Sequence, residues 1–172
     1  MSGSAACFGS TTGRPHNAIG RVFAQDGKPG LFKVPVDGSP PTRLTTGAAL
    51  NPVWSPDGNL IAYAGPNVSA FAPLLGIRPD GTPVSLPSIQ LRRDGERVRF
   101  AEDGKALIYM QGELRAQNFW RLDLVTMSTR QLTHFKQRDT MRTFDVTPDG
   151  KRIIFDRLRD NSDVVLIDRQ KR

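Results

Sequence analysis

The sequence predicts an all-β fold, a β-propeller built from four-stranded antiparallel blades. Three similar segments support this prediction, and each reads as a strand, a tight turn with an Asp-Gly pair, and a second strand. The Asp-Gly pairs begin at residues 57, 103 and 149, an interval of 46 residues each time. An aromatic residue follows each Gly by five positions, at Tyr63, Tyr109 and Phe155. A repeat of roughly 40–50 residues made of short strands is typical of propeller blades.

The turn is clearest in residues 54–63. Pro56 fixes φ near the value that a turn requires, and Gly58 takes the backbone where a side chain would clash. Aromatic and aliphatic residues flank the turn on both sides, as is typical of strands. One such turn predicts only a hairpin, but three at one interval predict an internal repeat.

The chain is expected to form a single domain over residues 1–172, divided into four blades. The approximate blades are 5–46, 51–88, 97–134 and 143–172. In the first blade we expect a weak first strand at 5–9, a loop over 10–19, and strands at 21–24, 31–36 and 43–45. In the second, strands flank the turn at 55–60, and a weak third strand at 74–78 precedes a fourth at 83–86. The third blade has strands at 98–100, 106–110, 119–124 and 130–133, and the fourth at 144–147, 152–155 and 164–168.

A single blade cannot bury both of its faces, so the blades must stack around an axis. The first strand of each blade then lines the central channel. Apolar residues of the second and third strands form the predicted core between blades, namely Ile61, Leu107, Ile108, Trp120, Leu122, Ile153, Val165 and Ile167. About four blades permit a closed ring, but the sequence favours an open one, because the repeat runs off both ends without a visible closing strand. We therefore expect this chain to be the C-terminal part of a longer propeller, continuous with further blades or domains, or to pair with another copy.

Composition excludes several classes of function. The chain has 24 Lys and Arg against 17 Asp and Glu, a net charge of +7, spread along its whole length. An anionic partner fits this charge, but without a basic stripe and stacking aromatics we expect no nucleic acid as a partner.

The sequence also predicts no membrane helix, because it contains no run of roughly 18–20 apolar residues. Cys7 is the only cysteine, which excludes an internal disulfide and a cysteine-based zinc site. We expect no export signal within this chain, whose first residues are neither basic nor apolar.

The repeat resembles a known family. The run of residues 52–58, the following Ile61-Ala62-Tyr63 and the Arg43-Leu44-Thr45 ending are similar to the TolB-type, WD-like propeller repeat, over roughly residues 20–170. The resemblance implies a non-catalytic propeller that acts as a protein- or peptide-binding scaffold or sensor in the periplasm or another extracytoplasmic location. Two alternatives stay open. One is the accessory propeller of a larger enzyme, either a prolyl-peptidase-like hydrolase or a receptor-like Ser/Thr kinase. The other is a sensor for carbohydrate or a small ligand.

The acidic and histidine residues do not predict a catalytic or metal centre. Asp57, Asp103 and Asp149 occupy the same turn of different blades, so we expect each to cap backbone N–H groups rather than to gather with the others. His16 and His134 have no second ligand at metal-type spacing. No nucleophile elbow occurs. The sequence therefore predicts no catalytic residue, no metal and no cofactor.

The candidate partner site lies on the loops that join the outer strand of one blade to the first strand of the next. These loops, 46–51, 92–97 and 134–142, gather at one end of a propeller. The last two are basic, with Arg92, Arg93, Arg97, Lys136, Arg138 and Arg142. Convergent cations at a concave mouth are suited to hold a carboxylate or an acidic peptide.

Overall fold

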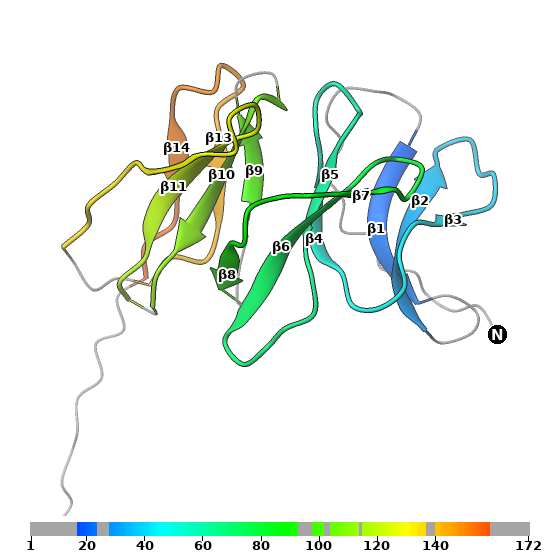
Figure 1. Ribbon diagram of the computed structural model, residues 1–172, viewed down its shortest axis with the longest axis horizontal. Helices are drawn as coiled ribbons and strands as arrows, with labels where there is room; N and C mark the ends of the chain where they lie inside the picture. Colours follow the sequence, from blue (N-terminus) through cyan, green and yellow to red (C-terminus); the bar gives the residue numbers. More distant parts are fainter. Residues whose placement is uncertain are drawn as a thin grey trace, which may run out of the picture.

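The computed structural model describes residues 17–23, 28–92, 98–101, 104–113, 115–136 and 140–158. Strands are the only regular elements in these ranges, and they form four antiparallel sheets, as Figure 1 shows. No helix of the described residues is long and apolar enough to cross a membrane. The prediction of an all-β fold is confirmed.

The sheets follow one another along the chain. Sheet 1 contains β1 (Asn17–Phe23), β2 (Pro29–Pro35) and β3 (Thr42–Arg43). Sheet 2 contains β4 (Leu50–Trp54), β5 (Ile61–Ala64), β6 (Phe71–Ile77), β7 (Pro83–Val84) and β8 (Gln90–Arg92). Sheet 3 contains β9 (Val98–Ala101), β10 (Ala106–Gln111), β11 (Asn118–Asp123) and β12 (Thr129–Gln131). Sheet 4 contains β13 (Phe144–Val146) and β14 (Ile153–Phe155).

The 46-residue repeat of the sequence is also a repeat of strand register. The first two strands of sheets 2, 3 and 4 pair through equivalent residues around their turns. The matching pairs are Trp54 with Ile61, Phe100 with Leu107, and Val146 with Ile153. The turn glycines Gly58, Gly104 and Gly150 all have positive φ, at 75°, 84° and 69°. This left-handed conformation explains why the repeat keeps a glycine at that position.

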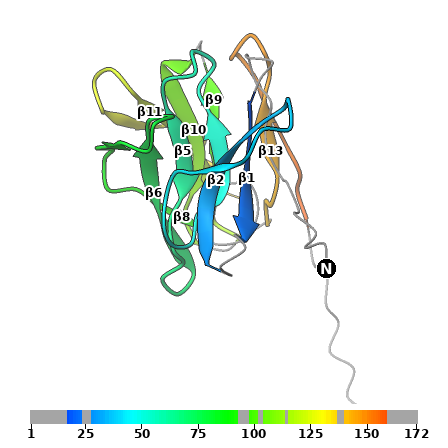
Figure 2. The same ribbon diagram turned by 90° about the vertical axis from the view of Figure 1, so that its right-hand side faces the viewer.

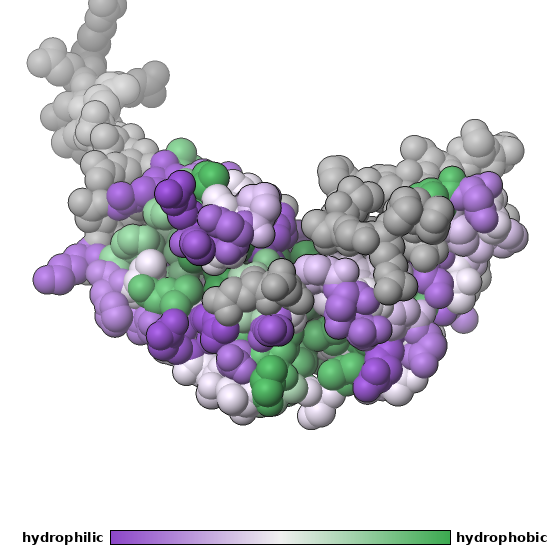
Figure 3. All heavy atoms as spheres, turned by 90° about the horizontal axis from the view of Figure 1, so that it is seen from above, coloured by the Kyte–Doolittle hydropathy of each residue, from purple (hydrophilic) through white to green (hydrophobic). Residues whose placement is uncertain are grey.

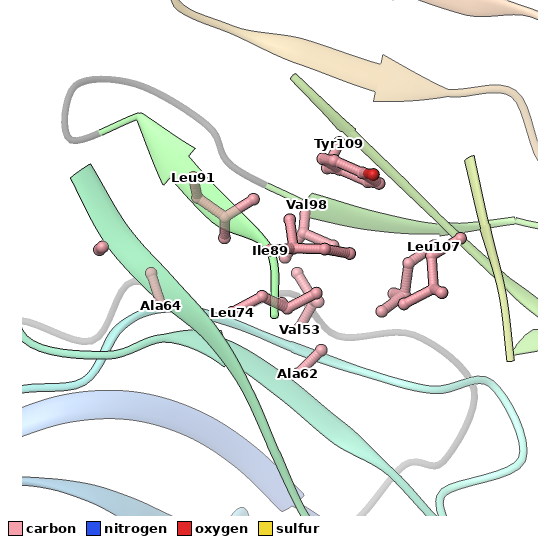
Figure 4. Close-up of a cluster of buried hydrophobic side chains, with 11 residues drawn as sticks. Val53, Ala62, Ala64, Leu74, Ile89, Leu91, Val98, Leu107 and Tyr109 are labelled. Atoms are coloured by element: carbon pink, nitrogen blue, oxygen red, sulfur yellow. The ribbon is translucent and has the colours of Figure 1, made fainter. Parts of the chain in front are cut away.

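Three apolar cores separate the four sheets. Between sheets 1 and 2, Leu31 packs with Ile61 and Ile77. Between sheets 2 and 3, the core is larger, and Figure 4 shows Leu74 and Ala62 facing Val98, Leu107 and Tyr109. Along β10 the side chains alternate between the two faces, because successive residues of a strand point to opposite sides. Leu107 and Tyr109 thus face sheet 2, whereas Ile108 and Met110 face sheet 4.

An aromatic cluster forms the core between sheets 3 and 4. The Phe119 ring lies 5.2 Å from both Phe144 and Phe155, in edge-to-face geometry with each. Phe135 adds a further edge contact to Phe119, with 6.4 Å between ring centres. Edge-to-face pairs add stability beyond the area that they bury.

The sheets are arranged radially. The first strands β4, β9 and β13 lie next to one another in space. Figure 2 shows β1 and β13 toward one side of the molecule, with β6 and β11 toward the other. From above, the molecule is a crescent that is hollowed along one side (Figure 3). The described residues therefore form part of a propeller whose ring is open.

The predicted core residues are largely confirmed. Ile61, Leu107 and Leu122 are fully buried and Ile108 nearly so. Trp120 and Ile153 are partly buried against the cores on either side of sheet 3. Val165 and Ile167, with the predicted strands at 5–9 and 164–168, lie outside the described residues.

Three details of the predicted strands are wrong. The loop expected over 10–19 gives way to β1 from Asn17 onward. The weak strand at 74–78 is the seven-residue β6, which begins at Phe71 and includes Pro73, whose carbonyl accepts a hydrogen bond from Gly65 N–H. The fourth strand of sheet 2 is followed by β8, which pairs with the first half of β6. Burial of Ile89 and Leu91 in the core holds this additional strand in place.

Candidate functional site

One end of the sheets carries two kinds of connection. Because antiparallel strands alternate in direction, the hairpin between second and third strands lies at the same end as the connection to the next sheet. We call this end the connection face. Its described segments are 44–49, 65–70, 112–113, 115–117, 132–136 and 140–143. The contact of Arg92 with Glu113, 3.8 Å from Nη1 to Oε2, links a strand end of sheet 2 to a hairpin of sheet 3 at this face.

Of the six predicted cations, the structure describes three. Arg92 is the last residue of β8 rather than part of a loop, because it pairs with Phe71 of β6. Its side chain is only 14% exposed and lies beside the Glu113 carboxylate. Lys136 and Arg142 are exposed on the connection between sheets 3 and 4. Arg93, Arg97 and Arg138 lie outside the described residues, so their place in the site stays a prediction.

The connection between sheets 3 and 4 is fixed on both sides of residues 137–139. Before them, Asn118 Oδ1 accepts hydrogen bonds from Phe135 N–H at 2.7 Å and from the Thr133 hydroxyl at 3.0 Å. After them, Asp156 Oδ1 accepts the N–H groups of Arg142 and Thr143 at 2.8 and 2.9 Å. Asn118 and Asp156 thus set where the backbones of Lys136 and Arg142 lie.

Asp156 is an anion that serves the backbone. Its limited burial would raise the pKa of the carboxyl, but the N–H groups of Thr143 and Arg142 outweigh that effect and lower it. The negative charge is therefore retained near neutral pH beside the start of β13. With Glu113 near Arg92, the connection face carries carboxylates as well as cations, which the sequence analysis did not anticipate.

Gln117 is a site residue that sequence reasoning missed. It lies just before β11, is only 2% exposed, and neither atom of its side-chain amide has a hydrogen-bond partner among the described residues. The Nε of Arg92 is likewise buried without a partner. Buried polar atoms nearly always find a partner, so these two side chains are suited to hold water or a polar group of a ligand. Nothing in the local sequence marks Gln117, because its burial comes from tertiary packing.

Two of the three repeated aspartates, Asp57 and Asp149, lie at the opposite end and act as turn caps, as predicted. Asp57 Oδ1 accepts hydrogen bonds from the Ser55 hydroxyl at 2.6 Å and from Asn59 N–H at 3.0 Å. Asp149 Oδ1 does the same for the Thr147 hydroxyl at 2.5 Å and Lys151 N–H at 3.1 Å. These hydrogen bonds lower the pKa of both carboxyls, and the bond from the hydroxyl has a larger effect than the bond from the backbone N–H. Asp103 lies outside the described residues.

Within the described ranges, no group of three His, Cys, Asp or Glu residues is placed to hold a metal ion. His134 is exposed on the connection face. His16 lies outside the described residues, so its predicted lack of a metal partner stays a prediction.

Comparison with known proteins supports the fold. No family model matches the chain, and no curated protein matches it by sequence. Among solved structures, TolB from Acinetobacter baumannii is similar with a TM-score of 0.60 and 19% identity, over 81% of this chain and 34% of that one. A putative TolB from Agrobacterium tumefaciens has a TM-score of 0.60 and 22% identity, over 86% of this chain and 52% of that one. An oligogalacturonate lyase in complex with manganese has a TM-score of 0.58 and 16% identity, over 82% and 44%.

The radial sheets and the shared turn define a β-propeller, and the solved structures show that it has the TolB-like propeller fold. The chain spans between 34% and 52% of the length of these structures, so it corresponds to a part of such a propeller. The predicted resemblance to TolB-type repeats is confirmed at the level of fold.

Proposed function

We propose that this chain is a non-catalytic propeller module that binds an acidic segment of a protein or peptide at its connection face. The observation that carries the proposal is the cationic connection between sheets 3 and 4. Lys136 and Arg142 present exposed side chains from a backbone that Asn118 and Asp156 hold in place. Cations on an ordered backbone lose less conformational entropy when they bind a carboxylate, which favours binding.

Buried contacts support the same connection. Met141 is 4% exposed within the aromatic core, immediately before Arg142, and Phe135 packs on Phe155 immediately before Lys136. Each exposed cation therefore follows an apolar anchor. A mobile charged loop would lack this pattern, in which the charged side chain is solvated while the neighbouring side chain is packed.

The test is the binding of a fluorescein-labelled oligoglutamate peptide to the 172-residue chain, measured by fluorescence anisotropy. A double variant, Lys136→Glu with Arg142→Glu, is expected to weaken binding by at least about tenfold. The matched control is Lys151→Glu with Arg152→Glu, which changes the net charge equally at exposed positions on the opposite end of sheet 4. The control is expected to retain most of the affinity. Equal losses in both variants would mean that only bulk charge attracts the peptide, and absence of binding to the parent chain would refute the proposal.

A second candidate rests on the oligogalacturonate lyase among the similar structures. In this reading the chain is the propeller part of a larger enzyme, and its cationic connection holds an anionic sugar. Oligogalacturonate is then expected to displace the labelled peptide and to bind the Lys136/Arg142 variant poorly. Neutral oligosaccharides are the control in this displacement experiment. If oligogalacturonate displaces the peptide at much lower concentrations than they do, this candidate is favoured over the peptide scaffold.

The extracytoplasmic location implied by the TolB resemblance is part of the proposal. Fractionation of cells that express the natural gene with a C-terminal tag is the direct measurement. Recovery of the tagged protein only with cytoplasmic markers would contradict it.

A further inference from the structure

A second kind of Asp-Gly turn recurs in the chain, between the third and fourth strands of a blade. In sheet 1, Asp37-Gly38-Ser39-Pro40 leads from β2 to β3, and in sheet 2, Asp80-Gly81-Thr82-Pro83 leads from β6 to β7. In each turn, Oδ1 of the Asp accepts the N–H of the residue two positions later, Ser39 or Thr82, at 2.9 Å. Because the two turns hold their carboxylates alike, the turn of sheet 2 is a reference for the turn of sheet 1.

The turn of sheet 2 is closed by two backbone hydrogen bonds. The N–H of Gly81 bonds to Arg78 O at 2.9 Å, and the N–H of Arg78 bonds to Thr82 O at 2.8 Å. The turn also packs against sheet 1, since a Cβ on Gly81 would lie 3.1 Å from Leu44 O. The glycine N–H of this turn is therefore held, and its backbone has little room to rearrange.

The turn of sheet 1 is more open because of one residue. Pro35 stands where sheet 2 has Arg78, and proline has no N–H to donate to Ser39 O. The other bond, from Gly38 N–H to Pro35 O, is 3.4 Å long, which is a weak hydrogen bond. Residues 36–42 are exposed, and a Cβ on Gly38 would meet nothing within 4 Å. The N–H of Gly38 is thus weakly held, in a turn that has room to change shape.

An Asp-Gly pair with a weakly held glycine N–H can react with itself. The glycine nitrogen loses its proton and attacks Cγ of the protonated Asp carboxyl, and a C–N bond forms as the carboxyl hydroxyl leaves as water. Water then adds to the five-membered imide. Opening at Cγ restores Asp, whereas opening at the backbone carbonyl carbon gives isoaspartate, in which the main chain runs through Cβ and Cγ. The water that is lost is regained, so the reaction consumes no co-reactant.

We propose that Asp37-Gly38 is a self-modification site, at which the folded protein forms isoaspartate faster than at its other described Asp-Gly pairs. Besides the turn at Asp80, these pairs begin at Asp57 and Asp149. Their glycine N–H groups are bonded at 2.9 and 2.8 Å, and hydroxyl groups hold their carboxylates. The turn between β2 and β3 lies at the end opposite the connection face, where an exposed loop tolerates an additional main-chain carbon (Figure 1). The modification is therefore independent of the proposed peptide site.

The test is peptide mapping of the 172-residue chain after incubation at neutral pH, by mass spectrometry with electron-transfer fragmentation, which distinguishes isoaspartate from Asp. In the folded chain, isoaspartate is expected to accumulate at Asp37 at least about fivefold faster than at Asp80, the effect of about one hydrogen bond. In denaturing urea the two rates are expected to be similar, because the two local sequences nearly match. Asp37→Glu cannot form the five-membered ring and is expected to remove the signal at this position.

Pro35→Ala tests the cause, because it restores a backbone N–H at the position of Arg78 in sheet 2. It is expected to slow isoaspartate formation at Asp37 to about the rate at Asp80. The matched control is Pro40→Ala, on the far side of the turn, which is expected not to slow the reaction. Circular dichroism verifies that both variants are folded. Equal rates at Asp37 and Asp80 in the folded chain, a difference that persists in urea, or a rate that Pro35→Ala leaves unchanged would overturn the proposal.

Discussion

The hydroxyl of Ser55 donates a 2.6 Å hydrogen bond to Oδ1 of Asp57 within the turn that joins β4 to β5. The same Oγ accepts the backbone N–H groups of Asn59 and Leu60, at 3.2 and 2.9 Å. One buried hydroxyl therefore organises both the turn and the start of the next strand. In sheet 4, Thr147 takes this role beside Asp149, and its Oγ1 accepts Arg152 N–H at 3.0 Å. Serine and threonine are interchangeable here because only the hydroxyl is used.

Removal of this hydroxyl is expected to destabilise the fold. Ser55 is 2% exposed, so Ser55→Ala leaves the N–H of Leu60 without its acceptor where water has little access. The expected loss is about 1–3 kcal/mol in the free energy of unfolding, measured by urea denaturation. Ser85→Ala, at an exposed serine between β7 and β8, is the control and should change stability little. Equal stability of the two variants would contradict the role given to the hydroxyl.

Acid is expected to destabilise the protein through its turn carboxylates. The N–H groups of Thr126 and Val125 bond to Asp123 and lower its pKa to about 2. An unfolded chain has its Asp pKa near 3.9, so it binds more protons than the folded chain between these two values. The stabilisation from Asp123 is complete above about pH 4 and is lost as the pH falls toward about 2.

Asp123→Asn tests this dependence, because an amide oxygen can still accept the N–H groups but does not titrate. The free energy of unfolding, measured by urea denaturation at several pH values below about 5, is expected to fall less steeply in the variant than in the parent. Identical acid slopes for the two proteins would show that Asp123 makes no contribution to acid sensitivity.

The repeat could be predicted from the sequence because its cause is local. The turn requires a residue with positive φ, and Gly58 and Gly150 supply it at the predicted interval. The alternation of Leu107 and Ile108 then follows from strand geometry alone. By contrast, β8 was not predicted, since the alternation of Ile89, Gln90 and Leu91 is too short to indicate a strand by itself, and the strand depends on the core that Leu91 shares with sheet 3.

The candidate site was less predictable than the fold. The charge of each residue is known from the sequence, and Lys136 and Arg142 are exposed, as a binding site made of cations requires. The pairing of Arg92 with Glu113 joins residues from two sheets, and the anchoring of Arg142 by Asp156 depends on the β13–β14 hairpin. Such contacts depend on how neighbouring sheets stack, and a linear pattern of charges does not contain that information.

Two turn glycines allow backbone strain to be separated from packing. Gly104 has a φ of +84°, and a Cβ there would lie 3.1 Å from Cδ of Pro56 in the adjacent turn. Gly38 has a φ of +85° with nothing within 4 Å of such a Cβ. Both Ala variants are expected to lose about 1–2 kcal/mol from the left-handed backbone. Gly104→Ala should lose about 1 kcal/mol more, because the turns of sheets 2 and 3 must separate. Equal losses in thermal or urea denaturation would mean that Pro56 moves freely.

The aromatic core between sheets 3 and 4 predicts that loss of its central ring destabilises sheet 4 more than the other sheets. Phe119 is fully buried and contacts the rings of Phe144 and Phe155, one from each described strand of sheet 4. Phe119→Ala removes both contacts and leaves a cavity, which is expected to cost about 3–5 kcal/mol in the free energy of unfolding. Because sheets 2 and 3 share a separate core, hydrogen exchange should accelerate most at the amides of β13 and β14.

Phe100→Ala is the matched control, since Phe100 belongs to the same sheet but packs, only partly buried, on the side of sheet 2. It is expected to cost less and to leave the exchange of β13 and β14 unchanged relative to the rest of the protein. If both variants accelerate exchange evenly over all four sheets, the propeller unfolds as one cooperative unit. The unfolding of one sheet would then be coupled to that of its neighbours more strongly than the separate cores indicate. Repeat proteins show such coupling when the interfaces between repeats contribute more stability than the individual repeats do.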